Sequence, residues 1–180
     1  MSLSTITKVE ASLIYLLQKG GSMEIMKLAK MLYLADYLYA KTFGHARGFM
    51  GGHARYDYGP VPVQFYPAFH SLTGEEILDR EGNIIELKKD GNLSGLTEEE
   101  LACLDSTLDE FKDKALGTVK NAAYRTEPMI EIQKEEEALG KGKLLWKEMD
   151  FSLINRHPLF SSDELDLSFM DDPEFKKNLA

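Results

Sequence analysis

The sequence predicts an α+β fold, mostly α-helical and forming a single domain, with a small antiparallel β-hairpin or sheet. Apolar residues recur at helical spacing over residues 4–18 and 23–41. Thr97 and Glu100 form a capping box, which marks the beginning of a later helix. Between these regions, two short apolar stretches flank the turn residues 81–83, as the strands of a hairpin do.

The first two helices are separated by a glycine turn. The helix over residues 4–18 ends at Gly20-Gly21, because glycine readily adopts the left-handed conformation that stops a helix. Ser22 is a suitable cap for the helix over 23–41.

Asp36 lies in the apolar stripe of this second helix, four residues after Leu32. Tyr33, Tyr37 and Tyr39 surround it at helical spacing. We therefore expect a half-buried carboxylate, which needs hydrogen-bond donors.

The next stretch, residues 43–62, is rich in glycine and includes a predicted strand at 55–58. The tetrapeptide Gly59-Pro60-Val61-Pro62 follows, and its prolines should keep it stiff and extended. Pro62 is expected to begin a helix that reaches about residue 72 and that Pro67 interrupts or kinks.

Later elements follow from turn and cap signals. Residues 77–80 and 84–88 should pair as a hairpin, and helices are expected over 97–112 and 118–124, the latter ending before Glu127-Pro128. Cys103 falls beside the buried seam of the first of these helices and is expected to be inert.

The chain has 180 residues, 43% of them hydrophobic and 28% charged, as expected for a globular protein. We expect one domain over residues 1–150 and an acidic tail over 151–180 that is loosely docked or disordered. The sequence has no apolar run long enough to span a membrane, no signal sequence and only one cysteine, which together predict a cytoplasmic protein. The net charge of −9 disfavours nucleic-acid binding.

Three common catalytic motifs are missing from the sequence: a phosphate-binding glycine pattern, a serine elbow and HExxH. We therefore assign no catalytic residues and no cofactor, and expect no enzyme. His45, His53 and Asp57 are a conceivable metal site, and a metal-dependent enzyme built on them is one of three hypotheses for the function. Their scattered spacing favours solvated loop histidines instead, so no metal ligand is assigned.

A helix-turn-helix DNA reader is the alternative function. Its recognition helix would be 23–41, with Lys27 and Lys30 on an exposed face and residues 77–88 as a wing. Against this reading, the helix carries leucine, methionine and tyrosine where base-reading side chains are needed.

Two motifs resemble the Panacea domain, a family related to GepA-like and SocA-like phage-associated proteins. They are "KLAKMLYLADYLYAKTFG" and, after a glycine-rich stretch, "ARYDYGPVPVQFY". The residues that match the family pattern are Lys30, Leu32, Tyr33, Leu34, Ala35 and Asp36, then Tyr58, Gly59, Pro60, Val61, Pro62 and Tyr66. The resemblance covers about residues 8–130. It departs at Pro67 and at 124–128, where Glu127 keeps the family's acid but its histidine is missing.

The resemblance implies a non-catalytic antitoxin of a prophage or toxin-antitoxin locus, which binds and neutralises a cognate toxin. In the SocA-like case it implies an adaptor that presents the toxin to a protease. A homodimer of this chain is also compatible with an antitoxin role. We expect the partner to contact exposed or half-exposed side chains near the two motifs, namely Tyr33, Tyr37, Arg55, Tyr56 and Tyr58.

The two motifs should also contact each other. We expect Asp36 to connect its helix to the Gly59–Pro62 segment, with donors from the helix start near Pro62, from the Tyr58 hydroxyl or from Arg55.

Overall fold

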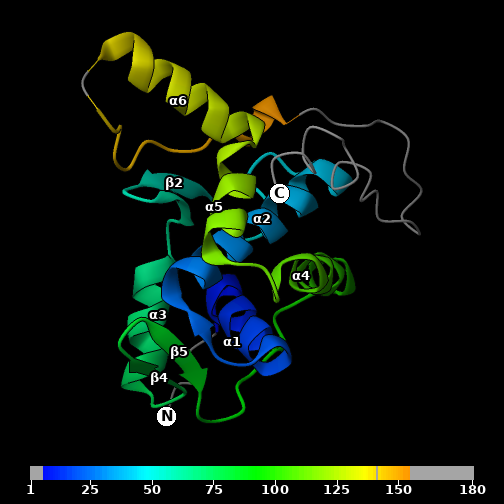
Figure 1. Cartoon of the computed structure of the whole chain (residues 1–180). Coiled ribbons are helices and arrows are strands. Elements are labelled where there is room, and N and C mark those ends of the chain that lie inside the picture. The colour runs from blue at the N-terminus through cyan, green and yellow to red at the C-terminus, as the bar shows by residue number, and fades with distance from the viewer. Residues whose placement is uncertain (1–5, 141, 155–180) are drawn as a thin grey trace.

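A computed structural model describes residues 6–140 and 142–154 of the protein (Figure 1). Its helices are α1 (Lys8–Gly20), α2 (Ile25–Phe43), α3 (Phe65–Gly74), α4 (Glu98–Phe111), α5 (Leu116–Tyr124), α6 (Glu127–Leu139) and the short 3₁₀ helix η1 (Phe151–Leu153). Its strands are β1 (Met23–Glu24), β2 (His53–Tyr56), β3 (Gly59–Pro62), β4 (Leu78–Glu81) and β5 (Ile84–Leu87). The predicted α+β, mostly helical class is confirmed.

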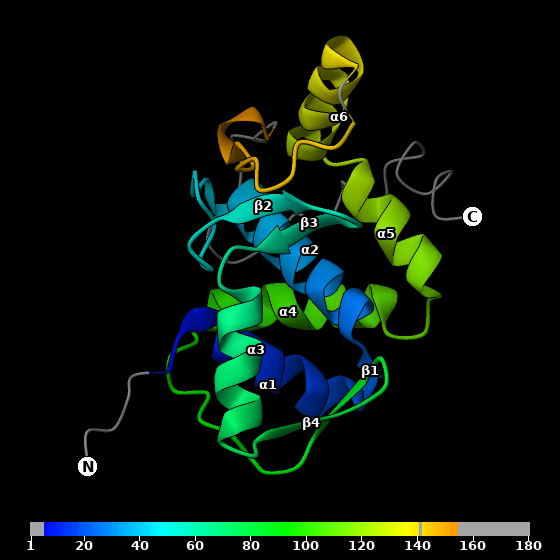
Figure 2. The same ribbon diagram turned by 90° about the vertical axis from the view of Figure 1, so that its left-hand side faces the viewer.

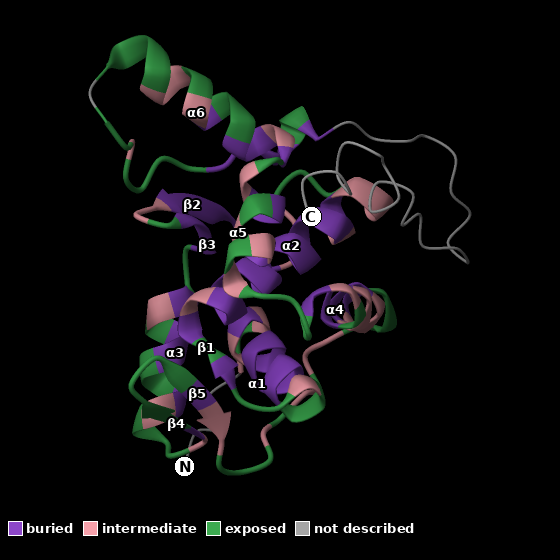
Figure 3. Ribbon diagram, in the orientation of Figure 1, coloured by how far each residue is buried: buried purple, intermediate pink, exposed green. Residues whose placement is uncertain are grey.

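Helix α2 is the centre of the core. Fourteen of its nineteen residues are buried, and it contacts α1, α4, α5 and β3 (Figures 2 and 3). A helix that is covered nearly all round must place any charged side chain it carries inside the protein. This applies to Lys30 and Asp36 alike.

The strands form two small antiparallel sheets within the described residues, one in the order β1-β5-β4 and one of β2 with β3. The β4-β5 hairpin was predicted and is confirmed. In the other sheet, Tyr56 pairs with Gly59 and His53 with Pro62. The chain returns along the free edge of β2, where the Arg55 N–H donates to Lys147 O at 2.8 Å and the Met149 N–H to His53 O at 2.8 Å.

Both N-terminal helices begin later than predicted. Thr7 and Glu10 form a capping box that fixes the start of α1 at Lys8. Met23 and Glu24 pair with β5 as strand β1, so α2 starts only at Ile25 and Ser22 is not its cap. Pairing with β5 gives the backbone N–H and C=O groups of Met23 and Glu24 hydrogen-bond partners that they would otherwise find in a longer helix.

The proline predictions are partly wrong. Residues 59–62 are extended, as expected, but Pro62 ends strand β3 and α3 begins at Phe65. Pro67 lies in the first turn of α3, where its missing N–H would have no partner within the helix, so it neither interrupts nor kinks the helix.

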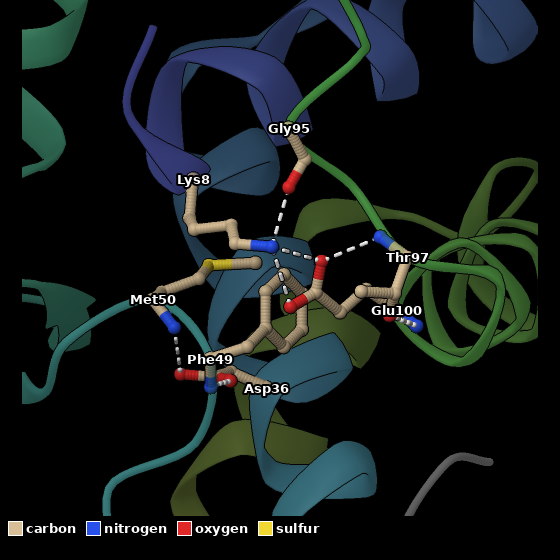
Figure 4. Close-up of polar contacts among 7 residues, drawn as sticks. All are labelled: Lys8, Asp36, Phe49, Met50, Gly95, Thr97 and Glu100. Carbon is tan, nitrogen blue, oxygen red and sulfur yellow. Dashed lines mark hydrogen bonds and ion pairs between the residues drawn. The ribbon is translucent and has the colours of Figure 1, made fainter. Parts of the chain in front are cut away.

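The capping box at Thr97 is confirmed, and it does more than begin helix α4. Glu100 accepts the Thr97 N–H at 2.8 Å and also pairs with the Lys8 ammonium at 2.6 Å, which connects α4 to the start of α1 (Figure 4). Cys103 of the same helix is fully buried, and burial raises the pKa of its thiol. No helix in the described residues is long and apolar enough to cross a membrane.

The end of the described chain packs against the core. Phe151 is 2% and Ile154 is 3% exposed, and the Phe151 ring stacks on the His53 ring with centroids 5.2 Å apart. Phe151 and Ile154, the first and fourth residues of the predicted tail, therefore pack against the core. The tail prediction for residues 155–180 lies outside the described residues.

Candidate partner-binding site

Asp36 is fully buried and is held by donors from the loop before β2. Its carboxylate accepts the Phe49 N–H at 2.5 Å, the Met50 N–H at 3.3 Å and the His53 Nε2–H at 2.6 Å (Figure 4 draws the two backbone bonds). The prediction that its donors are Arg55, Tyr58 or the helix start near Pro62 is wrong. Asp36 fixes the glycine-rich loop on α2 instead.

Gly48 makes room for this carboxylate. A Cβ atom at residue 48 would lie 2.2 to 2.3 Å from the carboxylate atoms of Asp36, and the backbone φ of 64° is one that other residues rarely adopt. The loop can therefore close over Asp36 only with glycine at this position.

Lys30 makes the contact between the two motifs that Asp36 was expected to make. Its ammonium donates to the Pro60 carbonyl at 2.8 Å, and the residue is 1% exposed. Burial, followed by the charges of Arg55 and Lys120, lowers the pKa of Lys30 from 10.5 to about 7.

The lysines proposed for DNA recognition are not available. Lys30 is buried, and Lys27 is 9% exposed and donates to the Lys112 carbonyl at 2.6 Å. The helix-turn-helix hypothesis placed both lysines on an exposed face of an amphipathic helix, but α5 and the end of α4 cover that side of α2.

Three of the five predicted contact residues are buried, so the expectation that they are exposed or half-exposed is wrong. Tyr33 is fully buried and its hydroxyl lies 2.6 Å from Thr126 Oγ1. Tyr37 is 3% exposed and donates to Glu127. Burial raises the pKa of both phenols, and for Tyr37 the nearby Glu127 carboxylate raises it further.

Arg55, the third of these residues, is 3% exposed. Its Nε donates to Glu136 Oε1 at 2.9 Å, and the Leu144 N–H donates to the same oxygen at 2.8 Å. Burial opposes ionisation of Glu136, but these hydrogen bonds outweigh it and lower the pKa of the carboxyl. Arg55 thus fixes α6 and the returning chain on β2.

The other two predicted residues belong to a partly exposed group of rings, here called the aromatic surface: Tyr56, Tyr58, Tyr66 and Trp146. Tyr56 is half-buried, with its ring centroid 5.4 Å from that of Tyr66 and 5.2 Å from that of Trp146. Tyr58 is 57% and Trp146 is 56% exposed. Trp146 has a φ of 64°, an unusual conformation for a non-glycine residue, in the turn that carries its ring outwards.

The aromatic surface borders a cleft. Tyr58 and Tyr66 line an open cavity of about 530 Å³, together with Lys30, Arg80 and Lys120. Rings and cations thus meet in a cavity that the first residues of α2 and α5 also line.

The conceivable metal site does not form. His53 is buried against Asp36, while His45 stacks on Tyr39 with ring centroids 5.1 Å apart. Over residues 6–140 and 142–154, no group of three His, Cys, Asp or Glu side chains is arranged to hold a metal ion.

A family model described as "Antitoxin SocA-like, Panacea domain" matches residues 28–129, more than half of the chain. The protein belongs to this family. Searches of curated proteins and of solved structures gave no match. The matched part of the Panacea domain contains Lys30, Asp36, His53 and the Gly59–Pro62 segment. It therefore includes the two buried polar contacts described above between α2 and the β2-β3 sheet, Lys30 with Pro60 and Asp36 with His53.

Sequence reasoning missed several residues of this Panacea domain site: Lys30 as a buried residue, and Tyr66, Arg80, Lys120 and Trp146 as surface residues. A signal existed for Lys30, because residues 31–35 directly after it carry no charged side chain on any side of the helix. Trp146 lies beyond the family match, and only the return of the chain along β2 brings it to Tyr56.

Proposed function

We propose that this Panacea domain is an antitoxin that neutralises a cognate toxin by binding it directly through the aromatic surface. The family match supports the antitoxin role, and one structural observation supports the place of binding. Within the described residues, two of the most exposed large hydrophobic side chains, Tyr58 and Trp146, both lie on this surface.

The composition of the surface fits this role. Tyrosine and tryptophan are enriched among residues that dominate protein interfaces, because they bury a large area at a small cost in side-chain entropy. The surface is also firmly supported. Arg55, which anchors β2, bonds to Glu136, and the Trp146 N–H donates to Arg55 O at 2.6 Å. A rigid surface loses less entropy on binding than a flexible one.

A co-expression experiment tests the proposal. The product of an open reading frame beside the gene is expressed alone, where it should arrest growth, and then with the full chain, where growth should recover. If no neighbouring product is toxic, or if co-expression gives no rescue, the antitoxin role is wrong.

Point variants then test the surface. Tyr58→Ala and Trp146→Ala should each weaken toxin binding by roughly tenfold or more, since truncation of a hot-spot residue costs about 2 kcal/mol. Leu153→Ala is the control, because Leu153 is 40% exposed but lies in η1, outside the surface. Equal binding by all three variants would place the interface elsewhere. Measuring toxin levels at the same time separates the two modes, since an adaptor for proteolysis lowers them and a direct neutraliser does not.

A further inference from the structure

The cleft beside the aromatic surface has an unusual charge for so acidic a protein. Among the residues that line it are three cations and one acid: Lys30, Arg80, Lys120 and Glu24. The whole chain carries a net charge of −9. We call this cavity the basic cleft.

None of the three cations has an acidic partner among the described residues. Lys120 lies over the Tyr124 ring at 5.4 Å, and Arg80 donates to the Gly82 carbonyl at 2.6 Å. Lys30 is the most unusual, because a buried ammonium has three N–H donors and Pro60 O is its one acceptor in the described part of the chain. A buried cation with no opposite charge is energetically costly.

Two helices also begin at the basic cleft. Ile25 and Met26 of α2 and Leu116 of α5 line it, and neither helix has a side-chain cap. The first N–H groups of a helix carry partial positive charge, although the Ile25 N–H of α2 already donates to Asn83 O at 2.8 Å and the Thr118 N–H of α5 to Ala115 O at 3.0 Å. They add to the field of the three cations, so the cleft favours an anion.

We infer that the basic cleft binds an aspartate or glutamate side chain of the protein partner. This inference rests on the proposed function, in which that partner is the toxin. The Ile25 and Met26 side chains can pack against the methylene groups of an acidic side chain, while Lys30 and Lys120 pair with its carboxylate. Tyr66 adds a hydroxyl that stays protonated, since burial, followed by its hydrogen bond with Tyr56, raises its pKa to about 12.

Binding should take up a proton. The charged and titratable groups that line the cleft with Lys30 are Glu24 on β1, Tyr58 between β2 and β3, Tyr66 on α3, Arg80 on β4 and Lys120 on α5, and the charge of Arg55 on β2 also acts on it. In the free protein the pKa of Lys30 is about 7, so this ammonium is partly neutral at physiological pH. An incoming carboxylate raises that pKa, and the complex is therefore tighter below pH 7 than above it.

Titration calorimetry of the full chain with a hexaglutamate peptide at low salt tests the inference, with hexaglutamine as the uncharged control peptide. Hexaglutamate should bind and hexaglutamine should not. Lys30→Met and Lys120→Met should each weaken binding by roughly tenfold, as expected for loss of a charge-assisted hydrogen bond. Glu24→Gln should strengthen it, since it removes the acid from the lining. Lys134→Met changes the net charge equally, but on exposed α6, and should leave the affinity within about twofold.

The pH dependence is the readout that a merely structural lysine would not give. Between pH 6 and pH 8 the affinity of the unmodified chain should fall roughly tenfold, as the protonated fraction of Lys30 falls. Lys30→Met should remove this dependence. Lys120 is half-buried, so Lys120→Met remains an independent test if Lys30→Met does not fold.

Three results would overturn the inference: equal hexaglutamate binding by the unmodified chain and Lys120→Met, no hexaglutamate binding by the unmodified chain, whether or not inorganic phosphate binds, or full toxin binding by Lys120→Met although its peptide binding is weakened. The peptide measurement needs no toxin. A failure of toxin rescue alone therefore refutes the proposed function, and a failure of the peptide measurement alone refutes only this inference.

Discussion

Replacing Asp36 by asparagine should destabilise the domain by about 3 kcal/mol, because hydrogen bonds to a buried charge contribute about 1.5 to 3 kcal/mol each. The carboxylate accepts from three donors, Phe49 N–H, Met50 N–H and His53 Nε2. An asparagine has one acceptor oxygen, so its NH₂ group faces either the Phe49 N–H or, at the other position, the Met50 N–H together with His53. His53 can accept from that group only by moving its proton to Nδ1, which has no partner in the described residues.

Urea unfolding followed by circular dichroism measures this cost, with a lower midpoint at an unchanged slope as the expected result. Asp57→Asn is the control. Asp57 is half-exposed and lies 3.5 Å from the Lys143 ammonium, so its loss should cost less than about 0.5 kcal/mol. A cost below about 1 kcal/mol for Asp36→Asn would refute the claim that this carboxylate anchors the loop. A double-mutant cycle with His53→Gln should show coupling between the two side chains.

Two further substitutions have matched controls, and a third prediction compares Lys30→Met with the unmodified chain. Gly48→Ala should lower the free energy of unfolding by about 3 kcal/mol, because it adds a clash with the buried Asp36 carboxylate to the strain of a positive φ. Gly51 has a φ of 85° and open space around it, so Gly51→Ala should cost only the strain, about 1 to 2 kcal/mol. Arg55→Met should cost about 3 kcal/mol and Arg47→Met less than about 0.5, since the two pairs have the same 2.9 Å separation but 3% and 71% exposed arginines. The free energy of unfolding of the unmodified chain should rise by roughly 2 kcal/mol from pH 7 to pH 9, because the folded state holds fewer protons on Lys30 than the unfolded state does. The rise should be smaller in Lys30→Met. Chemical unfolding measures the free energy of unfolding of all these variants, and for Lys30→Met and the unmodified chain it is repeated between pH 7 and pH 9. A free energy of unfolding that stays constant over this range would contradict the prediction for Lys30.

Local sequence signals predicted the elements that local interactions stabilise. The Thr97 capping box and the 81–83 turn gave α4 and the β4-β5 hairpin nearly to the residue. The same signal at Thr7 and Glu10 was present and was missed. Where a distant strand competes, local signals fail: β5 takes Met23 and Glu24 into a sheet, although Ser22 is a good cap.

The partners of the buried polar groups were harder to predict, because a sequence does not say which loop will cover a helix. Asp36 was correctly expected to need donors, but nothing local indicates that the loop at 48–50 and His53 supply them. His53 was taken for a solvated residue of a glycine-rich loop because of the scattered spacing of the candidate metal ligands. Its burial follows from β2, whose partner β3 packs on α2.

Lys30 and Asp36 present the same problem on one helix, and the fold solves it differently for each. Asp36 is fully buried and the chain supplies donors for both of its oxygens, so the loop is ordered without outside help. Lys30 is buried equally well, yet the described chain offers it one neutral carbonyl and two neighbouring cations, Arg55 and Lys120. Folding alone gains little from that arrangement, since a leucine or methionine would fill the space without the cost of a charge. A carboxylate from a partner would remove the cost, and the unfavourable charge in the free domain would then become part of the affinity of the complex.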